Sequence, residues 1–214
     1  MNNDQKIMKI VNNFDLFRDK LISQLNENEF CFIQVLVRRK DGHNESGVSG
    51  NNHNRLIKFY TIKNINEYDR FIDEIKLLCH VFNARAYIHP TKRNFIEVAN
   101  ELFRIFAKIY TDQNYSNLKR CYSTACGRSF VKKDKKYIID LDDEYASDDK
   151  IKEITEFINN KCAPLNIKKT LYMVPTVHGI HLICKPFNTA TFLNEYKNID
   201  IHKNNPSLLY YEVI

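Results

Sequence analysis

Two aspartates at the end of a short apolar run are the residues of this sequence best suited to chemistry. They are Asp140 and Asp142, in the segment 136–142 (KYIIDLD). Because side chains two apart on a strand share a face, both carboxylates would lie together while Ile139 and Leu141 face a core. Close carboxylates repel each other unless a cation lies between them, and oxygen ligands suit Mg²⁺ or Mn²⁺. The pair predicts a divalent metal site; the alternative is a strand that merely ends in an acidic loop.

The composition is that of a globular protein with a mild excess of positive charge. The 214 residues are 43% hydrophobic, carry a formal net charge of +6, and suffice for one large domain or two small ones. The charge is compatible with a nucleic-acid or nucleotide partner. No apolar run has the length of a signal peptide or a membrane span, so we expect a cytoplasmic protein without a membrane partner. Cys121 and Cys126 have a spacing found in half a zinc site, but we expect free thiols.

The hydrophobic pattern predicts an α+β protein. Over residues 1–130 we expect helices at 14–27, 65–80, 94–110 and about 116–124, and strands at 30–37, 55–62 and 84–89. The helix at 94–110 is expected to face the core with the apolar stripe Phe95, Val98, Ala99, Leu102, Phe106 and Ile109. Over residues 131–214, strands are expected at 136–142, 169–175, 179–185 and 207–213, and helices at 148–162 and 189–197. This β-α-β-β-α-β order is that of the ferredoxin-like, or RRM-like, unit.

That topology would bring distant polar residues together. We expect the first and third strands to lie side by side and parallel at the centre of the sheet, with the fourth strand beside the first. Both helices would cover one face and leave the other open. His181 on the third strand, and Asp200 just before the fourth, would then project from the open face beside Asp140 and Asp142. Three carboxylates and a histidine in one place would form a candidate active site.

Three short motifs resemble, in this order, the catalytic signature of the archaeo-eukaryotic primase superfamily, the primase-polymerases. They are Asp140-Leu141-Asp142, Gly179-Ile180-His181 and Ile199-Asp200. That family has an RRM-like catalytic unit behind an N-terminal α/β module, with the active site in the cleft between them. By this resemblance, residues 1–130 would be the N-terminal α/β module and 131–214 the catalytic unit. The resemblance implies a template-directed nucleotidyltransferase that joins a dNTP or NTP to a 3′-hydroxyl on single-stranded DNA or RNA.

The resemblance also implies roles for individual residues. Asp140, Asp142 and Asp200 would be the catalytic carboxylates and would hold two divalent ions, Mg²⁺ or Mn²⁺. His181 would contact the phosphates of the incoming nucleotide. Further nucleotide-binding candidates, close to His181 in sequence, are His178, Thr176 and Lys185.

Basic residues of the N-terminal module are candidates for contacts with the template backbone. These are Arg38, Arg39, Arg85, Lys92 and Arg93. The segment 84–89 alternates, so that Arg85 shares a face with Tyr87 and His89, a combination suited to stacking on a base or holding phosphate. No arginine follows the third motif, where that family often has a basic residue, and His202 and Lys203 are nearest. Many members of that family carry a fused helicase, which this sequence lacks. The chain would therefore either need a separate helicase or accessory subunit as a partner or be a minimal form.

Two other functions fit parts of the pattern. A phosphatase of the haloacid dehalogenase type also has its DxD after an apolar strand, but it expects Thr or Val two places beyond the second Asp, where this chain has Glu144. A non-catalytic module that binds single-stranded nucleic acid is the second alternative, because ferredoxin-like sheets often bind single strands. Such sheets present aromatic side chains, whereas the open face expected here carries carboxylates.

Overall fold

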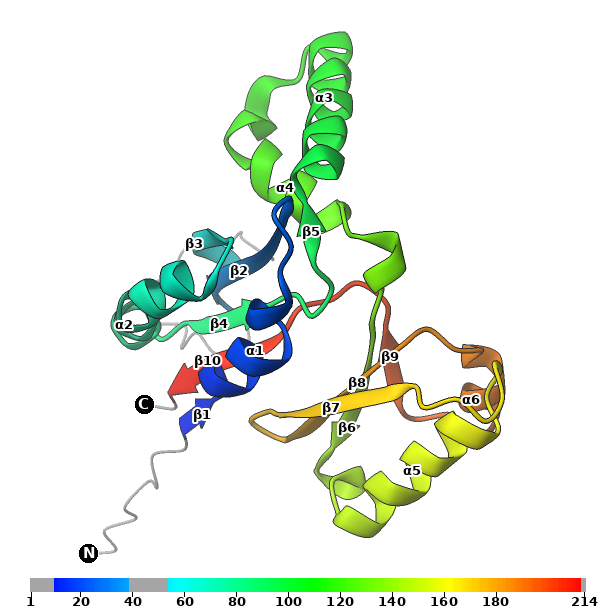
Figure 1. Ribbon diagram of the computed structural model, residues 1–214. Coiled ribbons are helices and arrows are strands. Elements are labelled where there is room, and N and C mark those ends of the chain that lie inside the picture. The colour runs from blue at the N-terminus through cyan, green and yellow to red at the C-terminus, as the bar shows by residue number, and fades with distance from the viewer. Residues whose placement is uncertain (1–9, 39–53, 213–214) are drawn as a thin grey trace, which may run out of the picture.

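The computed structural model describes residues 10–38 and 54–212, and it is a mixed α+β protein with two antiparallel sheets (Figure 1). The expected α+β class is confirmed. Arg39, one of the predicted nucleic-acid contacts, lies outside the described residues. Within the described ranges, no helix is long and apolar enough to cross a membrane.

The larger sheet has six strands, in the order β1-β10-β4-β2-β3 with β5 also paired to β2. These strands are β1 (Ile10–Asn12), β2 (Glu29–Val37), β3 (Arg55–Ile62), β4 (Arg85–Ile88), β5 (Arg93–Asn94) and β10 (Ser207–Glu212). Two helices, α1 (Phe14–Lys20) and α2 (Ile65–Val81), pack on one face of this sheet around buried Phe17 and Ile75. The first and last strands of the chain are therefore neighbours.

Helix α2 begins where the sequence predicts it, because Asn64 caps its first turn. The Asn64 side chain accepts a hydrogen bond from the Glu67 backbone N–H at 2.9 Å, and the Glu67 carboxylate accepts one from the Lys63 N–H at 2.9 Å. Both contacts satisfy backbone donors that the helix itself leaves unpaired.

A helical arm packs on the six-stranded sheet at its base and extends away from it (Figure 1). It consists of α3 (Phe95–Asp112), a 3₁₀ helix (Tyr115–Arg120) and α4 (Cys121–Arg128). The expectation that the whole apolar stripe of α3 faces the core is wrong. Val98 is buried, but Ala99 and Phe106 are exposed, because α4 and the sheet cover only one side of α3.

The smaller sheet has four strands in the order β7-β8-β6-β9. They are β6 (Tyr137–Asp142), β7 (Thr170–Pro175), β8 (Gly179–Cys184) and β9 (Asp200–His202). Helices α5 (Asp148–Asn160) and α6 (Thr189–Glu195) cover one face, where Ile139 and Leu141 are buried with Phe192. The two 3₁₀ helices Lys132–Asp134 and Asp143–Tyr145 flank β6. The predicted inward direction of Ile139 and Leu141 is confirmed.

Two expectations about this sheet are corrected. Strands β6 and β8 are antiparallel, because α5 returns the chain so that β7 runs parallel to β6 and the β7–β8 hairpin then reverses it. The strand beside β6 is the short β9, whereas the segment expected there, now β10, pairs with β4 and β1 in the larger sheet. The last strand of the predicted second unit thus belongs to the sheet of the first.

The face of the small sheet opposite its helices is open only in part. Ile138, Val174 and Ile183 project from it and join the core of the six-stranded sheet. Asp140 shares that face but is only partly buried. The two sheets are therefore in contact at one end of the shared face and separate toward the aspartates.

Candidate active site

A row of side chains crosses the small sheet and forms the centre of the site. Asp140 on β6 is paired with His181 on β8 and with Asp200 on β9, and His181 is paired in turn with Val174 on β7. Directly paired residues have Cβ atoms about 4.5–5.5 Å apart and project to the same face. Asp142, two residues beyond Asp140, projects there as well. The structure thus brings together the four residues that the three motifs contributed.

The register of this row depends on a close approach at Gly179. Gly179 is paired with Asp142 and has a φ of +134°, a conformation that side-chain-bearing residues rarely adopt. A Cβ at this position would lie 2.0 Å from the Leu141 carbonyl oxygen. The small residue at the start of the Gly179-Ile180-His181 motif therefore lets β8 approach β6, which brings His181 opposite Asp140.

Two histidines lie beside the central carboxylate. His181 Nε2 is 3.4 Å from Asp140 Oδ1, and His202 Nε2 is 3.8 Å from Asp140 Oδ2. The contact with His181, followed by that with His202, holds the pKa of the Asp140 carboxyl well below its usual range. The same carboxylate raises the pKa of His202. Asp140 is therefore ionised at neutral pH, although Asp200 lies beside it on the neighbouring strand.

His181 is held from both sides. Its Nδ1 forms a 2.9 Å hydrogen bond with Ser207 Oγ, while its Nε2 faces Asp140. Ser207 is fully buried at the start of β10, so this contact joins the two sheets. With one ring nitrogen committed to Ser207, the other is oriented toward the carboxylates.

The site opens into a cleft of about 770 Å³ between the two sheets. Its lining combines the carboxylate row with residues of the larger sheet: Leu36, Arg38, Asn54, Arg85, Tyr87, Asp140, Asp142, Thr176, Val177, His178, His181, Asp200, His202, Asn205, Pro206 and Leu208. The larger sheet contributes Arg38 and Arg85, and Arg85 also lies over the Tyr211 ring at 4.2 Å. The cleft therefore has an acidic wall and a wall with two arginines, and its volume is in the range of small-molecule sites.

The secondary nucleotide-binding candidates divide between two places. Thr176 and His178, on the β7–β8 turn, line the cleft. His178 is 3.9 Å from Asp143, but both side chains are largely exposed, so this ion pair is weak. Lys185 follows the far end of β8, is exposed and does not line the cleft.

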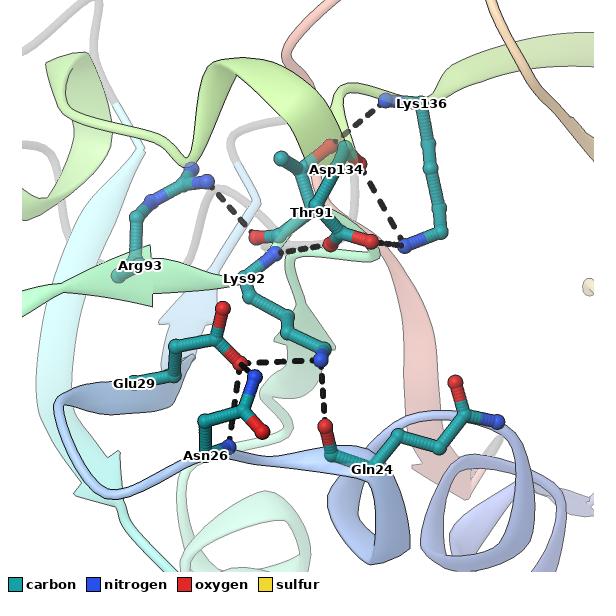
Figure 2. A network of polar contacts seen from close by, with 8 residues as sticks. All are labelled: Gln24, Asn26, Glu29, Thr91, Lys92, Arg93, Asp134 and Lys136. Atoms are coloured by element: carbon teal, nitrogen blue, oxygen red, sulfur yellow. Dashed lines mark hydrogen bonds and ion pairs between the residues drawn. The ribbon is translucent and has the colours of Figure 1, made fainter.

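Lys92 and Arg93, predicted as nucleic-acid contacts, are both buried in the interior and away from the cleft. The Lys92 ammonium donates to the Gln24 carbonyl and to the Glu29 carboxylate, the latter at 3.0 Å, and its backbone N–H donates to Asp134 (Figure 2). These interactions tie the loop before α3 to the segment before β6. We therefore assign Lys92 a structural role.

Arg93 is fully buried, and its guanidinium is hydrogen-bonded to backbone carbonyl oxygens and, among the described residues, not to a carboxylate. Its guanidinium donates to Cys126 O at 2.6 Å and to Thr91 O at 2.8 Å, and Nη2 lies 2.8 Å from His89 Nδ1 (the Thr91 contact is drawn in Figure 2). His89, expected on a surface with Arg85 and Tyr87, is buried and stacks on Phe32. Arg93 and His89 are consequently interior groups, whereas Arg85 and Tyr87 do line the cleft.

Sequence reasoning missed one residue of the site and gave another a different role. Ser207 carried no signal, because nothing in the pattern shows that β10 crosses to the other sheet beside His181. His202 was noted only as a basic residue after the third motif, and the structure adds its contact with Asp140. The alternation Asp200-Ile201-His202 was the available signal, since it puts His202 on the same face as Asp200.

Neither the cysteines nor a comparison with known proteins assigns a function to this chain. All six cysteines are buried and none forms a disulfide. Within the described residues, no group of three or more His, Cys, Asp or Glu side chains is arranged so that it could hold a metal ion. Comparison with family models, with curated proteins and with solved structures finds no match to this chain.

Proposed function

We propose that this protein is a primase-polymerase-like nucleotidyltransferase that adds dNTPs or NTPs to a 3′-hydroxyl on a nucleic-acid template. The observation that carries the proposal is the convergence of Asp140, Asp142, Asp200 and His181 on one face of a sheet, in a cleft with Arg38 and Arg85 opposite. Triphosphates carry negative charge, so such a site needs both metal-binding carboxylates and cationic side chains.

The strand arrangement supports a ferredoxin-like, or RRM-like, catalytic unit. The chain order β6-α5-β7-β8-α6-β9 gives the antiparallel sheet β7-β8-β6-β9, with both helices on one face. In this unit the first and third strands are central, which agrees with the positions of β6 and β8. The active site of the proposed enzyme would lie on the face that the helices leave uncovered.

The donor set fits Mg²⁺ or Mn²⁺. Asp140 and Asp200 face each other on adjacent strands and Asp142 follows on the same face, which is an oxygen-only set of hard ligands. Like charges directly opposite each other destabilise a sheet unless they are compensated. Two ions held by these carboxylates would neutralise the charge that develops on the attacking and leaving oxygens.

The side chains of the chain itself would bind and orient the nucleotide. His181, fixed by Ser207, would donate through Nε2 to a phosphate oxygen. Arg38 and Arg85 would pair with the remaining phosphate charge, because guanidinium groups bind phosphate in a bidentate way. Tyr87, on the same wall of the cleft, offers an aromatic surface to the base. The walls of the cleft would exclude much of the bulk water from the reacting groups.

Incorporation of a labelled nucleotide on a primed single-stranded template tests the proposal. With Mg²⁺ or Mn²⁺, the wild-type protein is expected to extend the primer, and Asp142→Ala and His181→Ala are expected to lose activity while remaining folded. Lys185→Ala, outside the cleft, is the matched control and should retain activity. A wild-type protein that binds single strands but incorporates nothing with any template, nucleotide or metal would replace this proposal with a non-catalytic binding module.

A further inference from the structure

Helix α3 has a second apolar stripe, and this one faces solvent. It consists of Ile96, Ala99, Phe103, Phe106 and Tyr110, all of them exposed. The spacing alternates between three and four residues, which is the a/d pattern of a helix that pairs with another helix. The first stripe, with Val98, Leu102 and Ile105, already packs against α4 and the sheet.

The exposed stripe is too apolar to be an ordinary solvent-facing surface. Ile96 is 63% exposed, Phe103 73%, Phe106 43% and Tyr110 78%. A fully covered aromatic side chain buries about 150–250 Å², so these side chains offer on the order of 500 Å². An uninterrupted apolar area of this size on a soluble protein marks a contact surface.

The chemistry of the stripe favours a protein helix over a nucleic acid. None of its five residues is charged, and the residues flanking it on the solvent side, Asn100 and Ala107, are uncharged as well. The charged side chains of α3, among them Arg104 and Lys108, lie on another side of the helix. Binding to a phosphate backbone depends on cations at the contact, and this stripe supplies none.

The stripe is complementary to itself in the antiparallel direction. If two copies of α3 cross with Phe103 on the two-fold axis, Ile96 lies opposite Tyr110 of the second copy, and Ala99 lies within one residue of the level of Phe106 of the second copy. Small residues then oppose large ones, which lets the two helices pack closely. A parallel pairing in register would instead oppose Phe106 with Phe106 and Ala99 with Ala99, and would pack poorly.

We propose that the α3 stripe is an interface between two copies of this chain, packed as an antiparallel helix pair around Phe103. A two-fold axis makes each copy contribute the same residues. The two copies together would bury roughly 1,000 Å², which is at the lower end for specific complexes, so the dimer should dissociate on dilution. Figure 1 shows α3 running outward from β5 along the arm, where a second copy can reach its outer face. The proposal is independent of the nucleotidyl-transfer chemistry.

Sedimentation velocity of the full chain, from low micromolar to several hundred micromolar, tests the interface. The wild-type protein is expected to move from monomer to dimer as its concentration rises. Phe103→Asp would bring two carboxylates together on the axis and should weaken the dimer by at least about tenfold. Lys108→Glu, an equally exposed charge change on another side of α3, should leave the dimer unchanged.

Cross-linking tests the direction of the pairing. In the proposed register, Ile96→Cys and Tyr110→Cys proteins should each stay uncross-linked alone and form an intermolecular disulfide when mixed under mild oxidation, since the native cysteines are buried. Cross-linking of each variant with itself would overturn the antiparallel arrangement. A protein that stays monomeric at every concentration would overturn the interface. If that monomer binds single strands and Phe103→Asp abolishes the binding, the stripe is a nucleic-acid contact instead.

Discussion

Ser207 on β10 and His181 on β8 share a 2.9 Å hydrogen bond, although they belong to different sheets. The serine is fully buried, which excludes it as a nucleophile and makes it a positioning residue. The larger sheet thus fixes the orientation of a side chain in the candidate active site on the smaller one. Relative movement of the two sheets would disturb His181 before it disturbed the carboxylates.

Replacing Ser207 with alanine should therefore change the state of the His181 ring. The ring loses its partner at Nδ1, so we expect an altered tautomer balance, together with a loss of about 1 kcal/mol in the free energy of unfolding. Long-range ¹⁵N–¹H NMR spectra of the imidazole report the tautomer directly. Ser116→Ala, an exposed serine on the arm, is the control. Ring nitrogen shifts identical to those of the wild type would show that Ser207 does not orient His181.

The contact between His202 and Asp140 should make part of the stability depend on pH. The Asp140 pKa is lowered, so its contribution is present above the unfolded pKa of about 3.9 and is lost as the pH falls through the lowered value. The His202 pKa is raised, so its contribution is present below about 6.5 and is lost as the pH rises through the raised value. The contact should therefore be strongest between about pH 4 and 6.5.

His202→Gln tests this dependence by urea unfolding. The variant should be less stable than the wild type at about pH 5.5, by less than about 1 kcal/mol because both groups are about one-third exposed, and the difference should vanish near pH 9. Lys161→Gln, at an exposed position after α5, serves as the control. A difference that is the same at both pH values would contradict the proposed ion pair.

Gly179 should be the least replaceable glycine of the described chain. Gly179→Ala combines a φ of +134° with a Cβ 2.0 Å from the Leu141 carbonyl oxygen, so we expect a loss of about 2–4 kcal/mol. Gly127→Ala is the matched control, because nothing lies within 4 Å of its Cβ and it is in helix α4, where alanine is favoured. Urea unfolding of both variants measures the contrast. Equal stabilities would mean that β8 can move away from β6 without cost.

We expect Arg93 to stabilise the fold and to make no contact with nucleic acid. Arg93→Met removes the donors to the carbonyl oxygens of Thr91 and Cys126 and leaves them buried, so we expect a loss of about 2–4 kcal/mol. The control is Arg104→Met, an exposed arginine whose contact with Glu101 is weak, with an expected effect within about 0.5 kcal/mol. Thermal unfolding measures both. If Arg93→Met left stability intact and abolished single-strand binding, the original prediction of a nucleic-acid contact would be restored.

Divalent ions should stabilise the folded protein if the carboxylates hold them. An ion that binds the folded state raises the free energy of unfolding in proportion to the logarithm of its concentration above Kd. We expect Mn²⁺ to raise Tm in the wild type, and to raise it less in Asp142→Ala and Asp200→Asn. Glu144→Gln, next to the row but not lining the cleft, is the control. Equal shifts in all four proteins would place the ions elsewhere.

The alternation of polar and apolar residues within single strands was enough to predict three residues of the candidate site. Asp140, Asp142 and His181 were predictable because the polar residues alternate with Ile139, Leu141, Ile180 and Leu182, and burial of that apolar set fixes the face of each side chain. Helix α5 was predictable for the same reason, because Ile151, Ile154, Phe157 and Ile158 have helical spacing. These features are set by residues within one element.

Sheet membership could not be read from alternation. The segment 207–213 was assigned to the edge of the small sheet, but residues 208–211 (LLYY) are apolar on both faces and all buried. Such a run indicates an interior strand, and that signal was overlooked. The burial of Lys92 and Arg93 had no signal, because it depends on carbonyl groups that only the folded chain brings together.

Strand β10 lies in the interior of the larger sheet, between β1 and β4, although the whole of the smaller sheet separates it from β4 along the chain. During synthesis, the edges of β1 and β4 stay unpaired until β10 has left the ribosome. Until then a nascent chain exposes two unpaired strand edges, and these edges can recruit chaperones or other chains. A truncation that removes β10 should leave both edges open and so lower the yield of soluble protein.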